Sequence, residues 1–512
     1  MFLTAEYCIK VRAMNTAPWT EILKLIEKGE DTIVFPSEIT AAFWRRQGLL
    51  CSDLKALPEE RLLSWDGFKE SLFFDVPEGS PANKLSRTLF ADNLLRENGT
   101  GRPLFSSVIP PEYASSSGIF SRELVSLLPR LGVFLDSPSA ERLDAFLLAD
   151  FKLIRERYRG FLKENSLFEP LELLLSVTKN VKTAERNFGA SSSLAFKARG
   201  GLAKKVIVFP EIIEDFAQYA PMLEVSPFIK TLSAGKAEDY RILRFPTVYD
   251  EINSVLARIR KLLDKGIHPD RIVITLCGLD KAEPAVREAA EQFDLALSFR
   301  SGKALAEYAP GKFFRRLLGA KDSNNSLNSL KVLFLDQSCP WREREVLKNI
   351  LYKGIEGFCP KDIPGERSWV ETLRRLGAGQ EAEVWRDFSR GLAGLTGAKD
   401  FSVLKRELHG FISKYLNPSA WETEDERALQ FSLSLLSEIA DSAEALKGIN
   451  LEDPLRLFIS FLEDKVYVPK AEEGAVKVFP YRVSAGIFPD YHFILNASQE
   501  NTSAKTAGMP LL

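Results

Sequence analysis

The alternation of short apolar stretches with helical stretches is the feature that most constrains how this chain folds. Residues 206–209 (Val-Ile-Val-Phe), 240–246 (Tyr-Arg-Ile-Leu-Arg-Phe-Pro) and 491–496 (Tyr-His-Phe-Ile-Leu-Asn) have the length and apolar character of core strands. Residues 31–35 (Asp-Thr-Ile-Val-Phe) form another short run, with a helix predicted on each side. The order helix, strand, helix predicts an α/β fold.

The sequence lacks the pattern by which many α/β folds grip a nucleoside triphosphate. That pattern, G-x-x-x-x-G-K-[ST], combines a backbone cradle for the phosphates with a lysine and a metal-binding hydroxyl. Gly-Lys occurs at 235–236, 302–303 and 311–312, and no hydroxyl residue follows any of the three. The run at 206–209 continues into Pro210 and a single Glu instead of the Asp-Glu pair that holds Mg²⁺. We therefore expect no ATP hydrolysis by this chain.

Composition sets wide limits. A chain of 512 residues exceeds the size at which one core stops growing, so two to four domains are expected. The net charge of -2 gives no global attraction to nucleic acid, so any DNA contact must use local basic grooves. Five cysteines without a C-x-x-C pair, and no run of about 18 apolar residues, predict a reduced, cytoplasmic protein that does not span a membrane.

The strand pattern is interrupted twice by helical segments. The first runs from about residue 85 to 183 and ends in a loop or linker predicted around residues 191–201. A second α/β segment starts at Asp239, and a second helical segment fills the chain from about 327 to 464. Strand signals return at 476–479 and 491–496, so the second helical segment is predicted to be an insertion within an α/β domain.

Several segments, taken in order, resemble superfamily 1 helicases of the UvrD type and, more closely, the AddB/RexB subunits of helicase-nucleases. Residues 36–44 and 63–68 are similar to two helicase segments that contact DNA. Residues 151–175 resemble the AddB helix and loop that precede a degenerate Walker B strand. Residues 249–318 resemble the second motor domain of AddB, and residues 483–495 resemble the segment written K-G-L-E-F, which carries a phosphate- or DNA-facing turn.

The departures from this family are as informative as the matches. In the K-G-L-E-F-like segment Ala485 stands in the position of the Lys and Phe488 in that of the Glu. The last, arginine-bearing helicase segment is absent before Leu512, as is the PD-(D/E)XK nuclease pattern of AddB proteins. The resemblance therefore covers the N-terminal, helicase-like half of such a subunit.

The resemblance implies an α/β fold with two RecA-like (P-loop-type) domains, each carrying a helical insertion. The implied layout is residues 1–60 and 200–236 for the first RecA-like domain, 61–199 for its insertion, 237–320 and 470–512 for an incomplete second domain, and 321–469 for its insertion.

The function implied is that of a non-catalytic, DNA-binding scaffold subunit in double-strand break repair by recombination. Its partners would be single-stranded DNA or duplex ends and an AddA/RexA-type subunit, which would bind the ATP and Mg²⁺; no cofactor is expected in this chain. One alternative is the motor half of an ATP-dependent helicase-exonuclease whose nuclease lies beyond residue 512. Another is an interaction module that has lost DNA binding altogether.

Five residues are candidate nucleic-acid contacts, and no catalytic or metal-binding residue is predicted. They are Thr40, Trp44, Arg45, Ser64 and Trp65. An aromatic ring beside positive charge, as in Trp44 and Arg45, is the pairing that stacks on and neutralises a single strand. The competing interpretation places both tryptophans in the core and the arginine in solvent. Trp341, with arginines at 342 and 344, carries the same ambiguity.

Overall fold

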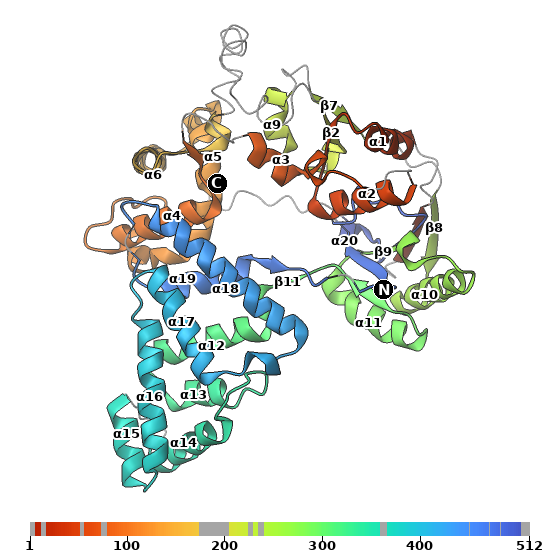
Figure 1. The fold of residues 1–512 in the computed structure, drawn as a ribbon. Helices are drawn as coiled ribbons and strands as arrows, with labels where there is room; N and C mark the ends of the chain where they lie inside the picture. Colours follow the sequence, from red (N-terminus) through yellow and green to blue (C-terminus); the bar gives the residue numbers. More distant parts are fainter. Residues whose placement is uncertain are drawn as a thin grey trace. The chain divides into compact units, whose positions relative to one another are not determined.

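The computed structural model divides the chain into two compact units, which we describe separately (Figure 1). Unit 1 consists of Met1–Arg87, Leu95–Ser301 and Lys470–Leu512, and unit 2 of Thr88–Leu94 and Gly302–Pro469. The structure describes residues 6–11, 17–51, 56–72, 79–173, 204–223, 229–233, 240–358, 366–449, 451–470, 472–481 and 483–502. The loop predicted around 191–201 and the Gly-Lys pair at 235–236 lie outside these residues.

The first sheet of unit 1 has four parallel strands in the order β3-β2-β6-β7. They are β2 (Thr32–Phe35), β3 (Leu62–Ser64), β6 (Lys205–Val208) and β7 (Ile229–Leu232). The central strands β2 and β6 are apolar on both faces, which is typical of a parallel sheet covered by helices on each side.

Helices cover the two faces of this sheet in pairs. Helices α1 (Ala17–Lys28) and α2 (Glu38–Cys51) pack against Ile33 and Val208. On the other face, α3 (Trp65–Leu72) and α9 (Phe216–Leu223) pack against Val34 and Ile207. Neighbouring strand residues point to opposite faces, so each strand contributes to both apolar clusters.

The second sheet of unit 1 has six strands in the order β10-β13-β9-β14-β1-β8. The first four are parallel, and β1 is antiparallel to both of its neighbours. The strands are β1 (Glu6–Val11), β8 (Tyr240–Phe245), β9 (Ile272–Leu276), β10 (Leu297–Phe299), β13 (Val476–Pro480) and β14 (Tyr491–Leu495). One apolar cluster joins helices α10 (Val248–Asp264) and α11 (Leu279–Gln292) to β9, β13 and β14.

The predicted fold class, α/β with P-loop-type sheets and helical regions between their strands, is confirmed. Two pairings differ from the predicted layout. Strand β1 was expected in the first domain with the rest of residues 1–60, but it pairs with β14 and β8 of the second sheet. Strand β3 falls within the predicted insertion at 61–199, yet it pairs with β2. The β1 pairings join strands more than 200 positions apart, and such pairing leaves no local signal in the sequence.

The helical region of the first sheet contains three main helices and a small parallel strand pair. The helices are α4 (Lys84–Gly99), whose middle residues belong to unit 2, α5 (Ser121–Leu135) and α6 (Ala145–Glu164), and the strands are β4 (Ser80–Pro81) and β5 (Leu167–Phe168). Arg87 donates two hydrogen bonds of 2.7 and 2.8 Å to the buried carboxylate of Glu169, which also accepts one from Tyr158. Burial and this carboxylate raise the pKa of the Tyr158 hydroxyl well above its usual range.

Unit 2 is helical, with a small two-stranded antiparallel sheet. Its helices are α12 (Ala309–Asp322), α13 (Leu327–Phe334), α14 (Arg344–Gly357), α15 (Glu366–Arg375), α16 (Gly379–Thr396), α17 (Phe401–Tyr415), α18 (Thr423–Glu444) and α19 (Pro454–Asp464). Strands β11 (Lys303–Ala304) and β12 (Val466–Tyr467) pair antiparallel. Trp341 is buried among the rings of Phe313, Phe334 and Phe388, and its indole N–H donates to the Leu333 carbonyl, so the core interpretation holds for it.

Within the described ranges, none of the helices has both the length and the apolar character needed to cross a membrane. The described residues also contain no group of three or more His, Cys, Asp or Glu side chains placed to hold a metal ion.

Candidate functional site

The candidate site lies at the carboxyl edge of the first sheet, where β2 and β6 end. In parallel α/β sheets, ligands bind outside the carboxyl ends of the strands at the point where the strand order reverses. Here the chain passes from β2 to β3 on one side and later returns to β6 on the other side of β2. The crevice between Phe35 and Val208, at the N-terminus of α2, is therefore the expected ligand position.

The turn from β2 into α2 is too short to cradle a phosphate. Only Pro36 and Ser37 separate the end of β2 from the start of α2. The Ser37 hydroxyl accepts a 3.2 Å hydrogen bond from the Thr40 backbone N–H, so this donor of the first helical turn is capped from within. A phosphate-binding loop instead presents a glycine-rich run of free backbone N–H groups ahead of the helix.

A loop that enters from the second sheet fills the space at this helix. The Thr40 hydroxyl donates a 3.1 Å hydrogen bond to the Ala485 carbonyl, and the Trp44 indole N–H donates one of 3.0 Å to the Gly486 carbonyl. The Phe488 ring lies 6.3 Å from the Trp44 ring and 5.3 Å from the Phe209 ring, centroid to centroid. The segment that resembles K-G-L-E-F thus packs against Trp44 and Phe209 through Phe488.

A second set of contacts joins α2 to the second sheet. Arg46 of α2 forms an ion pair with Asp270, which precedes β9. Asp270 also lies 2.9 Å from the Lys477 ammonium of β13 and 3.2 Å from His268 Nδ1. Sequence reasoning missed this cluster and the packing of Phe488, because Arg46 and Asp270 are 224 positions apart and Thr40 and Ala485 are 445 positions apart.

The acids after β6 do not form a metal site in the described structure. Phe209 adopts a left-handed backbone, φ 57°, and turns the chain into a short 3₁₀ helix. Asp215 accepts a 2.6 Å hydrogen bond from the Trp65 indole N–H and a 2.9 Å one from the Lys69 ammonium. Burial by itself lowers the pKa of Lys69, but the hydrogen bonds to Asp215 and Asp66 outweigh it, so the pKa is raised.

Three of the five predicted contact residues are buried. Thr40 and Trp44 are 0% exposed, and Trp65 is 3% exposed. Trp44 belongs to the cluster beneath α1 and α2, whereas Trp65 belongs to the cluster beneath α3 and α9 on the opposite face of the sheet. The structure therefore does not bring the two indoles together, and neither ring presents a face on which a base could stack.

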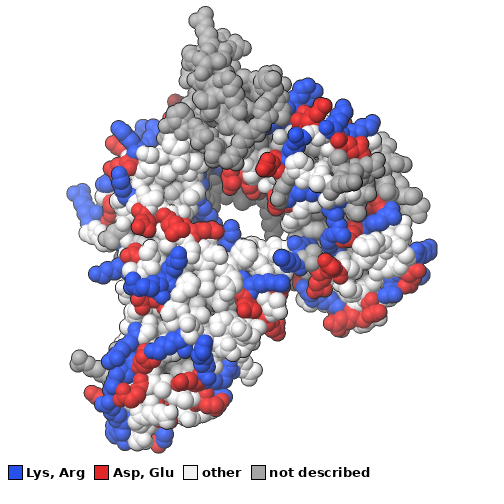
Figure 2. All heavy atoms as spheres, viewed as in Figure 1, with Lys and Arg blue, Asp and Glu red and all other residues white. Residues whose placement is uncertain are grey.

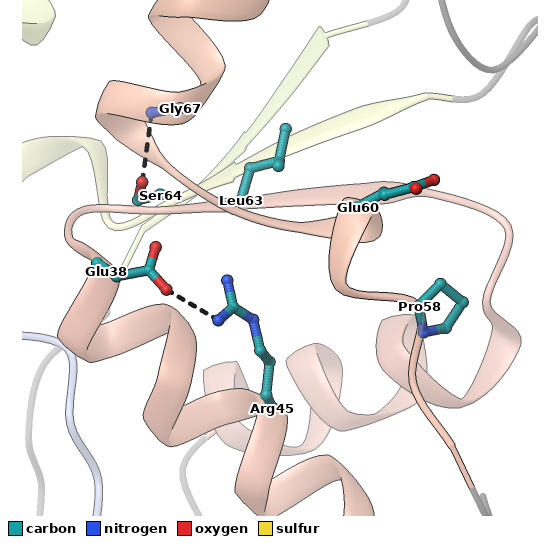
Figure 3. A pocket seen from close by; sticks show the side chains of 7 residues that line it. All are labelled: Glu38, Arg45, Pro58, Glu60, Leu63, Ser64 and Gly67. Atoms are coloured by element: carbon teal, nitrogen blue, oxygen red, sulfur yellow. Dashed lines mark hydrogen bonds and ion pairs between the residues drawn. The ribbon is translucent and has the colours of Figure 1, made fainter. Parts of the chain in front are cut away.

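The other two predicted residues, Arg45 and Ser64, line one surface pocket of about 450 Å³ (Figure 3). Arg45 donates hydrogen bonds of 2.8 Å to Glu38 and 2.9 Å to the Leu62 carbonyl, and so ties α2 to β3. The Ser64 hydroxyl caps α3 by accepting a hydrogen bond from the Gly67 N–H. The pocket is also lined by Pro58, Glu60 and Leu63, and its two glutamates oppose an anion.

The fold and the site define the class of protein: an α/β unit of the P-loop type, with a helical unit inserted between two of its strands. Comparison with known families agrees. Residues 20–188 match the family described as Treponema TP0900 N-terminal P-loop domain, and residues 306–468 match the Treponema TP0900 fourth helical domain. The chain is thus similar to the TP0900 family in a P-loop domain and a helical domain.

A relative from Treponema pallidum (strain Nichols), described as an uncharacterized protein, aligns with most of the chain. It is 24% identical over 538 residues, which cover 92% of this chain and 64% of the relative. The chain therefore spans less than two thirds of that relative's length. The descriptions of these matches mention neither AddB nor RexB.

Proposed function

We propose that this protein is a non-hydrolysing, helicase-like scaffold that binds DNA beside a separate motor subunit. The observation that carries the proposal is the packing of the loop at Ala485, Gly486 and Phe488 onto α2 and Phe209, at the carboxyl edge of the sheet where ligands bind in such folds. A domain that keeps its two sheets while its own loop fills the nucleotide position is suited to binding and positioning rather than to an ATP-driven cycle.

The DNA part of the proposal rests on the similarity of residues 36–44 and 63–68 to DNA-contacting helicase segments. The partner would be an AddA/RexA-type subunit that supplies the ATP and Mg²⁺, and the setting would be double-strand break repair by recombination. Thr40, Trp44 and Trp65 would then support this edge of the sheet from within, because they are buried. Arg45 and Ser64 would approach the bases of the strand rather than its phosphates, because the two glutamates of their shared pocket oppose an anion.

The full chain should show no ATP turnover above background, with or without single-stranded DNA, in a coupled phosphate-release assay. The two described Gly-Lys pairs are in the wrong places for a phosphate loop, because Lys303 lies in strand β11 and Lys312 lies within α12. Turnover that disappears on Lys303→Ala or Lys312→Ala would contradict the proposal. In parallel, fluorescence anisotropy at low salt should detect binding of a labelled single strand, and no binding would remove the DNA part.

A further inference from the structure

In unit 2 an exposed phenylalanine ring packs against a buried tyrosine ring. Phe431 of α18 is 52% exposed, and its ring centroid lies 5.1 Å from that of Tyr467 in β12. Tyr467 is itself 7% exposed and also contacts the ring of Tyr308 at 5.6 Å. The Tyr467 hydroxyl donates a 3.1 Å hydrogen bond to Glu424, which fixes the supporting ring. The Phe431 ring is therefore packed against Tyr467 on one face and exposed to solvent on the other.

Cationic side chains lie on or beside the two strands at the supporting ring of Tyr467. Lys303 of β11 is directly opposite Tyr467 of β12 in the antiparallel pair, and residues in such a pair project to the same face. Lys465 immediately precedes β12. Among the described residues, no carboxylate lies within 4.0 Å of the ammonium of Lys303 or Lys465. Arg427, one helical turn before Phe431, is instead paired with Glu424.

An exposed aromatic ring with unpaired lysines beside it has the two parts of a single-strand contact. The ring offers a π-face to any base, and the lysines offer charge to the backbone phosphates. The tryptophans predicted for this task cannot offer a face, since both are buried. We infer that Phe431, supported by Tyr467 and flanked by Lys303, stacks on one base of a single-stranded DNA. This inference rests on the proposed function and names a base contact for it.

The test compares Phe431→Ala and Phe431→Leu with wild type, using the full chain and an oligonucleotide that carries 2-aminopurine. Loss of a stacked base should weaken binding by about 5- to 150-fold. Phe431→Leu keeps an apolar side chain without a π-face, so its DNA affinity should fall nearly as far as that of Phe431→Ala. The 2-aminopurine emission should be quenched by wild type and not by either variant. Phe146→Ala is the matched control, because Phe146 of α6 is 75% exposed and should not change either measurement.

The outcomes distinguish failure of the Phe431 stacking site from failure of the proposed DNA-binding function. If wild type binds no single strand at all, the proposed DNA function fails and the stacking site fails with it. If wild type binds and both Phe431 variants bind equally well, only the stacking site is overturned. Equal DNA binding together with a lost dimer in sedimentation would instead assign Phe431 to an interface between copies of this chain. Circular dichroism of each variant shows whether the fold is kept, which is expected for a half-exposed ring.

Discussion

Trp44 and Trp65 show how the surroundings of a single residue decide its role. Each indole N–H has an acceptor inside unit 1, the Gly486 carbonyl for Trp44 and the Asp215 carboxylate for Trp65. A buried tryptophan with a satisfied N–H is a packing residue. The sequence left the stacking and core interpretations open, because the face of α2 that is buried depends on a loop more than 400 positions away.

Replacing either tryptophan by alanine should destabilise the protein without changing its intrinsic DNA affinity. Each change removes a large buried ring, so the free energy of unfolding should fall by about 3–5 kcal/mol. Urea unfolding measures this loss, and titration of the remaining folded protein with a labelled single strand measures affinity. Tyr249→Ala is a suitable control, since Tyr249 is 66% exposed and its loss should cost less than about 0.5 kcal/mol. A stable Trp44→Ala variant with weakened DNA binding would restore the stacking interpretation.

At the scale of elements, most core strands could be predicted and their partners could not. The predicted strands at 31–35, 206–209, 240–246 and 491–496 agree with β2, β6, β8 and β14 to within one residue at each end. These strands are short runs rich in apolar, aromatic and β-branched residues, so their signal is local. Strand β3 has three residues, and β1 completes a sheet whose other strands begin more than 200 positions later, so neither assignment follows from local pattern.

Three of the predicted contact residues share one helix, and two of these three are buried. Thr40, Trp44 and Arg45 all lie on α2, which does form the wall of the crevice. In the sequence, Phe488 stands out only because it replaces the Glu of the family pattern. Its packing against Trp44 and Phe209 needs the three-dimensional meeting of α2, β6 and the loop before β14, which no spacing in the sequence encodes.

The loop that closes the crevice depends on Gly486. Its φ of +81° is in the left-handed region, and an added Cβ would lie 3.0 Å from the Phe209 ring and 3.1 Å from the Thr40 methyl group. Gly486→Ala should therefore lower the free energy of unfolding by about 1–3 kcal/mol, through backbone strain and the tight contact together. Urea unfolding followed by tryptophan fluorescence measures the change.

Gly160→Ala is the matched control for this substitution. Gly160 lies within α6, and an added Cβ there would meet nothing within 4 Å. Alanine is a better helix former than glycine, so the free energy of unfolding of this variant should rise by about 0.5–1 kcal/mol. If Gly486→Ala is as stable as wild type, the loop does not pack on α2 as described.

For the whole molecule, charge limits how DNA can be held. The net charge is -2, and Figure 2 shows basic and acidic side chains interspersed on the visible face of both units. The basic residues of α6, for instance, are largely paired, Arg155 with Asp136 and Arg159 with Glu172. Long-range attraction to a polyanion is therefore weak, and binding must come from a few local contacts.

Single-strand binding should accordingly be weak and strongly dependent on salt. Each phosphate contact adds about 0.7 to the slope of log affinity against log salt, so roughly three contacts would lose at least about tenfold between 50 and 200 mM salt. Anisotropy titrations across that range measure the slope. Lys303→Ala should reduce the slope by about 0.7, the value for one phosphate contact. Lys28→Ala, at the exposed end of α1, should leave the slope unchanged. An affinity that does not vary with salt would mean that phosphates are not what this protein holds, and the nucleic-acid proposal would then lose its electrostatic basis.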